Sequence, residues 1–239
     1  MAFLPITAAE MRERGWEQPD IVVVTGDAYV DHPSFGAAII SRVLEAKGYR
    51  VCMLSQPRSA ADFTRFGRPR LAFFVGAGNI DSMVAHYTAA KRPRGEDAYT
   101  PGGKTGARPD RATIVYCRQI RQVYGDIPIA IGGLEASLRR FAHYDYWDDA
   151  VRPSILLDSG ADWLVYGMGE LQDLEIADRL AAGEAPAAIR DIRGICVAVP
   201  VEEYTPGPCA ECPSFERVAA PTDEGRRQYA IAARIQQDE

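Results

Sequence analysis

The sequence predicts an α/β fold built on an open, mostly parallel sheet with helices on both faces. Residues 21–24 are four β-branched residues without polar alternation, which is typical of a strand buried on both faces. From Phe35 onward apolar residues recur at helical spacing, and Gly48 is placed where a left-handed helix cap is expected. Residues 49–54 are strand-like again. Because parallel strands need a crossover of about this length, residues 21–54 are predicted to form one strand–helix–strand unit.

The loop that follows this first strand is dense in polar groups. Because it lies at the carboxyl end of its strand, where open α/β sheets bind their ligands, we expect a binding site there. An alternative is that Asp31 or Ser34 only caps the following helix, for which Pro33 suits the first turn. A cap needs neither a second aspartate nor a histidine and a tyrosine. The candidate cofactor- or substrate-binding residues of this loop are Thr25, Gly26, Asp27, Tyr29, Asp31 and His32.

Three more buried strands are expected at residues 71–76, at residues 128–133 and within residues 161–170. Each ends in glycines that are followed by Asn or Glu. The carboxyl ends of parallel strands share one edge of the sheet, so these residues should converge with the first loop. The candidates added in this way are Gly76, Asn79, Gly132, Gly133, Glu135, Ser137, Gly167, Gly169 and Glu170.

This convergence predicts one concave pocket, lined by Asp27, Asp31, His32, Glu135 and Glu170. Gathered carboxylates raise one another's pKa by repulsion, so we expect His32 and the loop from Arg92 to Arg108 to supply positive charge. If the carboxylates serve a ligand, replacing Asp27 or Glu135 by alanine should leave the fold nearly intact. We assign no catalytic residue and no metal ligand in this chain.

Helix signals lie between the expected strands. Thr7 and Glu10 have the spacing of a capping box, which predicts a short helix near the amino terminus. Asp110 is expected to cap a later helix that buries one face, so Cys117 on that face is a core residue. Residues 223–239 form a charged helical stretch that stops without glycine or proline, as a cut chain would.

Composition excludes several classes of protein. With 239 residues and a formal net charge of -6, the chain can form one large domain but lacks the excess of Lys and Arg that is typical of a general nucleic-acid surface. A local basic patch at residues 65–70 and 91–94 stays open. No apolar run has the length of a membrane span, and the amino terminus has no signal-peptide pattern, so we expect a cytoplasmic protein without a membrane partner. The five irregularly spaced cysteines argue against a secreted disulfide framework.

Three further motifs suggest specific chemistry. Residues 102–105 are not a phosphate-binding loop, because no strand precedes them and a required glycine is missing; a surface loop or lid over residues 91–111 is favoured. A lone pair of cysteines, Cys209 and Cys212, cannot fill a four-ligand zinc site. The acidic and aromatic residues 141–149 could bind a metal or form a recognition or packing surface, and the second is favoured. The candidate metal ligands there are His143, Asp145, Asp148 and Asp149.

Five runs of the sequence are long and unusual. They are residues 25–36 (TGDAYVDHPSFG), 97–104 (DAYTPGGK), 132–140 (GGLEASLRR), 143–149 (HYDYWDD) and 166–170 (YGMGE). Together they resemble the amino-terminal region of the YgiQ-type radical SAM proteins over nearly the whole chain. The resemblance implies a flavodoxin-like or cobalamin-binding-like domain at residues 21–200. A lead-in at residues 1–20 would precede it, and a linker and helix at residues 201–239 would lead to a radical SAM core that this chain lacks.

Such proteins bind a four-iron, four-sulfur (4Fe-4S) cluster through cysteines spaced Cys-x-x-x-Cys-x-x-Cys and cleave S-adenosylmethionine reductively to a radical. This chain has no such triplet. The resemblance therefore implies that cluster and S-adenosylmethionine bind elsewhere in the full-length protein. This region would be an accessory domain that covers the protein's own radical SAM barrel or helps to bind a substrate of unknown identity.

Two alternatives stay open. The first is that the domain binds cobalamin, although its loop departs from the usual cobalamin signature Asp-x-His-x-x-Gly because Asp31 and His32 are adjacent. The other is a stand-alone nucleotide-, flavin- or cobalamin-binding α/β protein. The absence of a phosphate-binding glycine fingerprint in the sequence makes that reading the weaker one.

Overall fold

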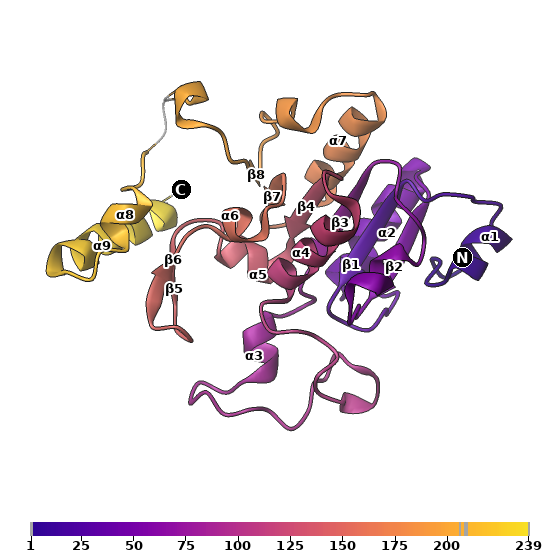
Figure 1. The fold of residues 1–239 in the computed structure, drawn as a ribbon, viewed down its shortest axis with the longest axis horizontal. Coiled ribbons are helices and arrows are strands. Elements are labelled where there is room, and N and C mark those ends of the chain that lie inside the picture. Colours follow the sequence, from indigo (N-terminus) through magenta and orange to yellow (C-terminus); the bar gives the residue numbers. More distant parts are fainter. Residues whose placement is uncertain (1, 206, 208–209, 239) are drawn as a thin grey trace.

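The computed structural model describes residues 2–205, 207 and 210–238, and helices alternate with strands over most of the chain (Figure 1). In chain order the elements are α1 (Ala8–Glu13), β1 (Ile21–Thr25), α2 (Gly36–Lys47), β2 (Val51–Ser55), β3 (Ala72–Gly76), α3 (Ser82–His86), α4 (Ala112–Tyr124), β4 (Ile129–Gly132), α5 (Gly133–Leu138), β5 (His143–Asp145), β6 (Ala150–Arg152), α6 (Ile155–Ser159), β7 (Trp163–Val165), α7 (Glu170–Ala181), β8 (Ile195–Cys196), α8 (Phe215–Val218) and α9 (Asp223–Asp238).

A six-stranded sheet in the order β2-β1-β3-β4-β7-β8 forms the centre of the molecule. The first five strands are parallel, and β8 pairs antiparallel with β7 at the edge. These five follow the 2-1-3-4-5 order of flavodoxin-like folds, in which the strand order reverses between β1 and β3. The predicted α/β fold with a mostly parallel sheet is therefore confirmed.

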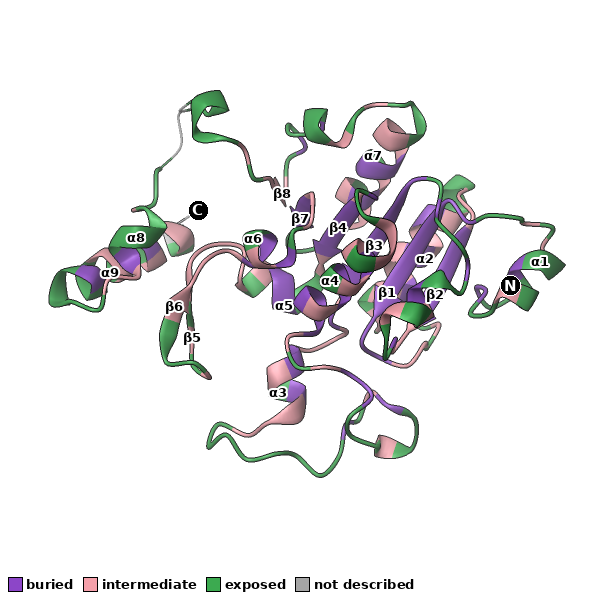
Figure 2. Cartoon of the chain, viewed as in Figure 1, coloured by how far each residue is buried: buried purple, intermediate pink, exposed green. Residues whose placement is uncertain are grey.

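Helices cover both faces of the sheet, as predicted. Side chains alternate between the faces along each strand, so Val22 and Val24 of β1 pack in one apolar cluster while Ile21 and Val23 pack in the other. The first cluster includes residues of α4 and α6, and the second includes residues of α2 and α7. Cys117 is fully buried in the first cluster, which confirms it as a core residue. Figure 2 shows the strands buried and the outer helix faces exposed, which explains the unbroken apolar runs in the sequence.

Local signals at helix ends are confirmed in part. Thr7 forms the predicted capping box before α1, and Gly48 ends α2 with a φ of 105°. The alternative that Asp31 or Ser34 caps α2 is wrong, because Phe35 occupies the cap position and makes no side-chain hydrogen bond there. The first loop therefore reaches the helix without using its polar side chains as caps.

Asp110 does not cap α4, contrary to expectation. Arg111, with a φ of 51°, occupies the cap position. The Asp110 carboxylate instead accepts a hydrogen bond from the Tyr87 hydroxyl at 2.8 Å and lies 2.5 Å from His86 Nδ1. The Asp110 side chain thus contacts residues distant in sequence and does not bond to the start of the helix in the way that the local sequence pattern predicted.

The remaining elements lie beside the sheet. β5 and β6 form a separate antiparallel hairpin, and α8 and α9 lie beyond it (Figure 1). The helix predicted at residues 223–239 is present as α9 within the described residues. It approaches the hairpin where the Tyr229 hydroxyl accepts a hydrogen bond from the Tyr144 amide at 3.0 Å. None of the helices described for this chain is long and apolar enough to cross a membrane.

Candidate functional site

A cavity of about 320 Å³ opens at the carboxyl edge of the sheet, between the first turns of α2 and α7. The ends of β1, β3, β4 and β7 form its floor. Open α/β sheets bind ligands at this edge, where the strand order reverses, and the volume is at the lower end of the range for small-molecule sites. Eight of the predicted site residues line it: Thr25, Gly76, Asn79, Gly132, Gly133, Gly167, Gly169 and Glu170.

Glycine is required at two of these positions by the surrounding structure. A Cβ on Gly169 would lie 2.7 Å from Cγ1 of Val165, closer than real side chains approach. Gly133 has a φ of 81°, a conformation that other residues rarely adopt. The strand-end glycines therefore let the backbone itself form part of the cavity wall.

Asp173, one helical turn after Glu170 on α7, is a site residue that the sequence analysis missed. It lines the cavity, is only 8% exposed and receives no hydrogen bond from the described residues. Burial, and to a smaller extent the Glu170 carboxylate, raise the pKa of Asp173 to about 8. An acidic residue in an amphipathic helix that carries several others is typical of a solvated position. The spacing of three residues from Glu170 was the one signal that placed it on the same helix face.

Asp27 turns away from the cavity and forms a buried ion pair. Its Oδ1 lies 2.9 Å from Nη2 of Arg108, which is also 3.3 Å from Oδ2 of Asp97, and all three side chains are at most 3% exposed. Burial raises the pKa of Asp27, although Arg108 opposes the shift. The loop from Arg92 to Arg108 thus supplies a cation to Asp27, as predicted, but in the protein interior instead of the pocket.

Asn79 joins two loops at the cavity edge. Its backbone amide donates to Asp27 Oδ2 at 2.7 Å, and its side-chain amide donates to the Ser34 carbonyl at 3.0 Å. Its Oδ1 accepts a hydrogen bond from the Gly36 amide at 3.3 Å. These bonds fix the loop after β3 against the start of α2.

Besides Asp27, four more predicted residues of the first loop lie outside the cavity: Gly26, Tyr29, Asp31 and His32. Asp31 accepts a hydrogen bond from Arg42 Nε of α2 at 3.0 Å, and the Arg42 contact lowers the pKa of Asp31. His32 is exposed, and its Nδ1 accepts the amide hydrogen of Ser34 at 3.1 Å. The Tyr29 hydroxyl accepts a hydrogen bond from the amino-terminal segment. The expectation that Asp31 and His32 line the pocket is therefore wrong.

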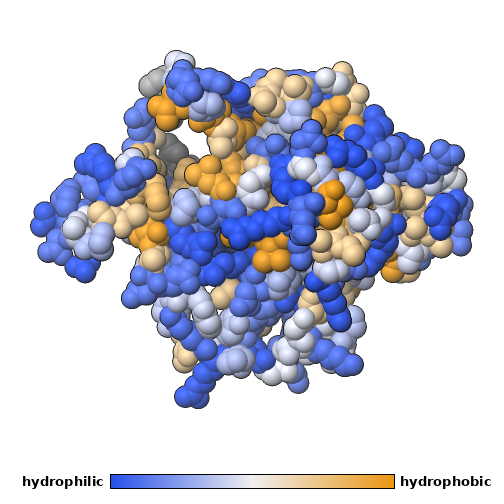
Figure 3. Space-filling view, viewed as in Figure 1, coloured by the Kyte–Doolittle hydropathy of each residue, from blue (hydrophilic) through white to orange (hydrophobic). Residues whose placement is uncertain are grey.

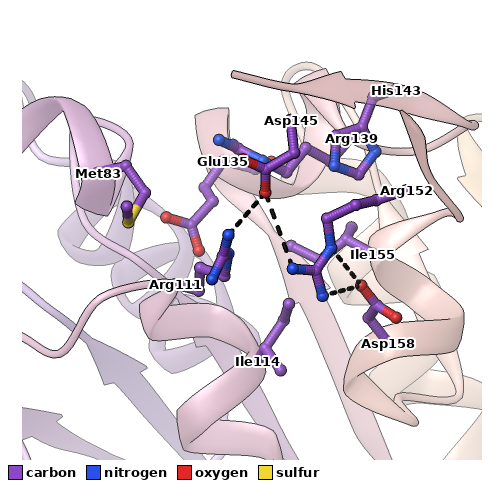
Figure 4. Close-up of a pocket in the computed structure, with 10 residues that line it drawn as sticks. All are labelled: Met83, Arg111, Ile114, Glu135, Arg139, His143, Asp145, Arg152, Ile155 and Asp158. Carbon is purple, nitrogen blue, oxygen red and sulfur yellow. Dashed lines mark hydrogen bonds and ion pairs between the residues drawn. The ribbon is translucent and has the colours of Figure 1, made fainter. Parts of the chain in front are cut away.

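The prediction that Glu135 lines this cavity is also wrong. It is 2% exposed, and its carboxylate accepts hydrogen bonds from the Ser82 amide at 2.8 Å, the Ser82 hydroxyl at 2.5 Å and the Thr113 amide at 3.1 Å. Because α5 begins directly after β4, Glu135 faces α3 and α4 instead. It borders a second hollow of about 10 Å³, room for about one water (Figure 4). Ser137 accepts a hydrogen bond from the Gly167 amide at 3.2 Å.

The acidic window at residues 141–149 contacts arginines. Nη2 of Arg111 lies 2.9 Å from Asp145 Oδ2 and 2.7 Å from Asp148 Oδ2, and Arg152 lies 2.9 Å from Asp148 (Figure 4 shows the Arg111–Asp145 pair). Burial lowers the pKa of His143. Within the part of the chain that the structure describes, no three His, Cys, Asp or Glu residues are grouped so that they could hold a metal ion.

Two cysteines of the described chain lie in the core. Cys52 and Cys117 are buried, and burial raises the pKa of each thiol to about 12. The predicted pair of Cys209 and Cys212 cannot be placed, because Cys209 lies outside the described residues. The rejected phosphate loop is irregular, with a single 3-10 turn at Pro101–Gly103.

Comparisons with known proteins give a family match over almost the whole chain. The model of the family described as "Radical SAM N-terminal" matches residues 3–239. UPF0313 protein GSU2873 of Geobacter sulfurreducens is 54% identical over 237 residues, which are 98% of this chain and 38% of the relative. A UPF0313 protein of Clostridium perfringens is 55% identical over 239 residues, 99% of this chain and 36% of the relative. The chain thus spans well under half the length of these curated relatives.

One solved structure resembles this chain in fold, with low sequence identity. It is that of the radical S-adenosylmethionine methyltransferase TsrM from Kitasatospora setae, with a TM-score of 0.46 and 17% sequence identity. The similar region covers 74% of this chain and 28% of that chain.

Proposed function

Because this chain belongs to the radical SAM N-terminal family, we propose that it is the accessory domain of a radical SAM enzyme and that its carboxyl-edge cavity binds the substrate. The catalytic core would be the partner of this domain in the longer protein. Bound there, an iron–sulfur cluster would supply the electron that cleaves S-adenosylmethionine.

The cavity is the observation that carries this proposal. It is the larger of the two hollows described above, at about 320 Å³ against about 10 Å³, and it lies at the ligand-binding edge of the sheet. Its walls are mostly apolar and glycine, so they can exclude water from a bound molecule. Glu170 and Asp173 supply the acidic groups of the lining.

The described residues assemble no site for an iron–sulfur cluster, and they offer no His32 ligand to a cobalamin in the cavity. Of the cysteines, Cys52 and Cys117 are buried in the core, and the structure brings no three metal-binding side chains together in its described part. His32, the nearest counterpart of a cobalamin ligand, lies outside the cavity and bonds to its own turn. The proposal therefore gives this domain a substrate role and no cofactor.

Exposed apolar side chains follow the strand ends at the carboxyl edge of the sheet, and of these Met168 lines the cavity. Leu134, Leu138, Met168 and Leu171 follow the strand ends and are 47%, 63%, 86% and 77% exposed. On the face seen in Figure 3, apolar side chains gather near the centre, in the region of β7, α5 and α6. Exposed apolar side chains close together are typical of interaction sites, so we propose that this edge faces the catalytic core.

A chimera tests the proposal. This chain would replace the matching segment of the Geobacter sulfurreducens relative, with the variant Ala37→Trp to fill the cavity and Ala46→Trp, exposed on the same helix, as control. We expect a small-molecule extract of that organism to stimulate methionine release from S-adenosylmethionine in the unmodified chimera and in the control. Ala37→Trp should abolish the stimulation and retain the basal rate. Equal stimulation in both variants, or none in the unmodified chimera, would contradict the proposal.

A further inference from the structure

The carboxyl group of Asp173 indicates what kind of molecule the cavity accepts, and this inference rests on the proposed function. Asp173 is more than nine-tenths buried, lines the cavity and has no hydrogen-bond partner among the described residues. Its carboxyl oxygens are not among the fully buried unpaired atoms of the described residues, so they reach the cavity, where water or a ligand must bond to them. Such a group at the wall of a cavity is complementary to a ligand that bonds to it.

The charges around the cavity exclude acidic ligands. None of the described residues that line it is Lys, Arg or His, whereas Glu170 and Asp173 are acidic. The amino terminus of α7 favours negative charge, but the Glu170 carboxylate already provides that charge in its first turn. At the amino terminus of α2, the Gly36 amide is bonded to Asn79. A phosphate or carboxylate in the cavity would meet two acids and no cation.

The walls favour a flat ligand. Glycines that follow or end three strands (β3, β4 and β7) and glycines at the starts of α2 and α7 line the cavity, together with the apolar side chains of Val23, Ile39, Ile40, Phe74 and Val165. Backbone without side chains allows a ring to approach closely, and apolar side chains gain from contact with its faces.

We propose that the cavity binds a flat nitrogen heterocycle, neutral or cationic, whose edge presents an N–H donor beside a ring nitrogen to the Asp173 carboxyl. This edge of the ligand can bond to the Asp173 carboxyl whether the carboxyl is protonated or ionised. A protonated carboxyl donates its O–H to the ring nitrogen and accepts the N–H, while an ionised carboxyl accepts both hydrogens from the protonated ring. Because burial raises the pKa of Asp173 to about 8, both states are accessible near neutral pH.

Calorimetric titration of the chain with three bicyclic probes tests this inference. 2-Aminoquinoline has the required edge, 2-methylquinoline has the same shape without the N–H, and 2-naphthoate is an anion. We expect 2-aminoquinoline to bind at least tenfold more tightly than either of the others. Asp173→Leu should remove this preference, and Asp173→Asn, which keeps an acceptor, should weaken it partly. Glu175→Gln, exposed on the same helix, should bind as the unchanged chain does.

The outcomes separate this inference from the proposed function. Three results would overturn the ligand class. They are tighter binding of 2-naphthoate than of 2-aminoquinoline, no binding of 2-aminoquinoline, and 2-aminoquinoline affinities of folded Asp173→Leu and Asp173→Asn that equal that of the unchanged chain. If Ala37→Trp still abolished the stimulation in the chimera, the proposed function would stand although the ligand class had failed. If the probe bound through Asp173 while Ala37→Trp had no effect on turnover, the ligand class would stand and the proposed function would fail.

Discussion

Replacing Asp173 by asparagine should stabilise the folded chain at neutral and alkaline pH. The carboxyl is buried, and its pKa is raised from the ordinary 3.8 to about 8 in the folded chain. In the unfolded chain it ionises near its ordinary pKa. The folded state therefore loses stability, relative to the unfolded state, as the pH rises from about 4 to about 8, and loses no more above that range.

The size of the effect follows from the two pKa values. At pH 7 the carboxyl lies about three units above its unfolded pKa, and each unit corresponds to about 1.4 kcal/mol, so the cost reaches about 4 kcal/mol as an upper bound. The asparagine amide is also buried without a partner, which costs about 1–3 kcal/mol. We therefore expect Asp173→Asn to gain about 1–3 kcal/mol at pH 7–8, with each kcal/mol raising the Tm by about 2–4 °C.

Thermal unfolding from pH 4 to pH 8.5 measures this. The difference in Tm between Asp173→Asn and the unchanged chain should rise with pH and should be zero or negative at pH 4. Glu175→Gln is the matched control, since its exposed side chain should change stability by less than about 0.5 kcal/mol at any pH. A difference that does not depend on pH would refute the burial of an unpartnered carboxyl at this position.

Three more predictions follow from the described contacts. Arg108→Met should destabilise the chain by about 3–5 kcal/mol in urea unfolding, because it leaves Asp27 and Asp97 buried without their cation; a loss below about 1 kcal/mol would show that water reaches this site. Glu135→Ala should cost about 2–4 kcal/mol, since three donors lose their acceptor, but should not change 2-aminoquinoline affinity per folded molecule; a selective loss of affinity would return Glu135 to the binding site. Anaerobic incubation of the chain with iron and sulfide should give no absorbance of a four-iron cluster, and a stable stoichiometric cluster would contradict the domain assignment.

The sheet could be predicted from the sequence because its signals are local. Unbroken apolar runs mark strands that are buried on both faces, and glycines mark the strand ends that border the cavity. Residues 192–199 are predicted from the sequence as an extended run and contain the two-residue strand β8, but no local signal predicts its antiparallel pairing with β7.

The direction of the polar side chains could not be predicted, because it depends on distant partners. Asp27 is bound by Arg108, which lies in another loop, and Glu135 is bound by the amides of Ser82 and Thr113. The structure therefore leads us to expect a loss of stability when either carboxylate is removed, the reverse of the expectation from sequence. Asp173 was missed because its burial in the cavity wall depends on how α7 packs against the sheet, which the sequence of α7 alone does not show.

Mapping the ligand site on the isotope-labelled chain by NMR tests the central claim most directly. The chain would be titrated with 2-aminoquinoline and, separately, with the small-molecule extract, and the backbone amide shifts would be followed. We predict that both perturb the amides of Gly76, Gly132 and Gly169 at the carboxyl edge of the sheet before any others. Shifts that begin in the hairpin at residues 143–152 or in the loop at residues 87–110, with the cavity amides unmoved, would contradict it.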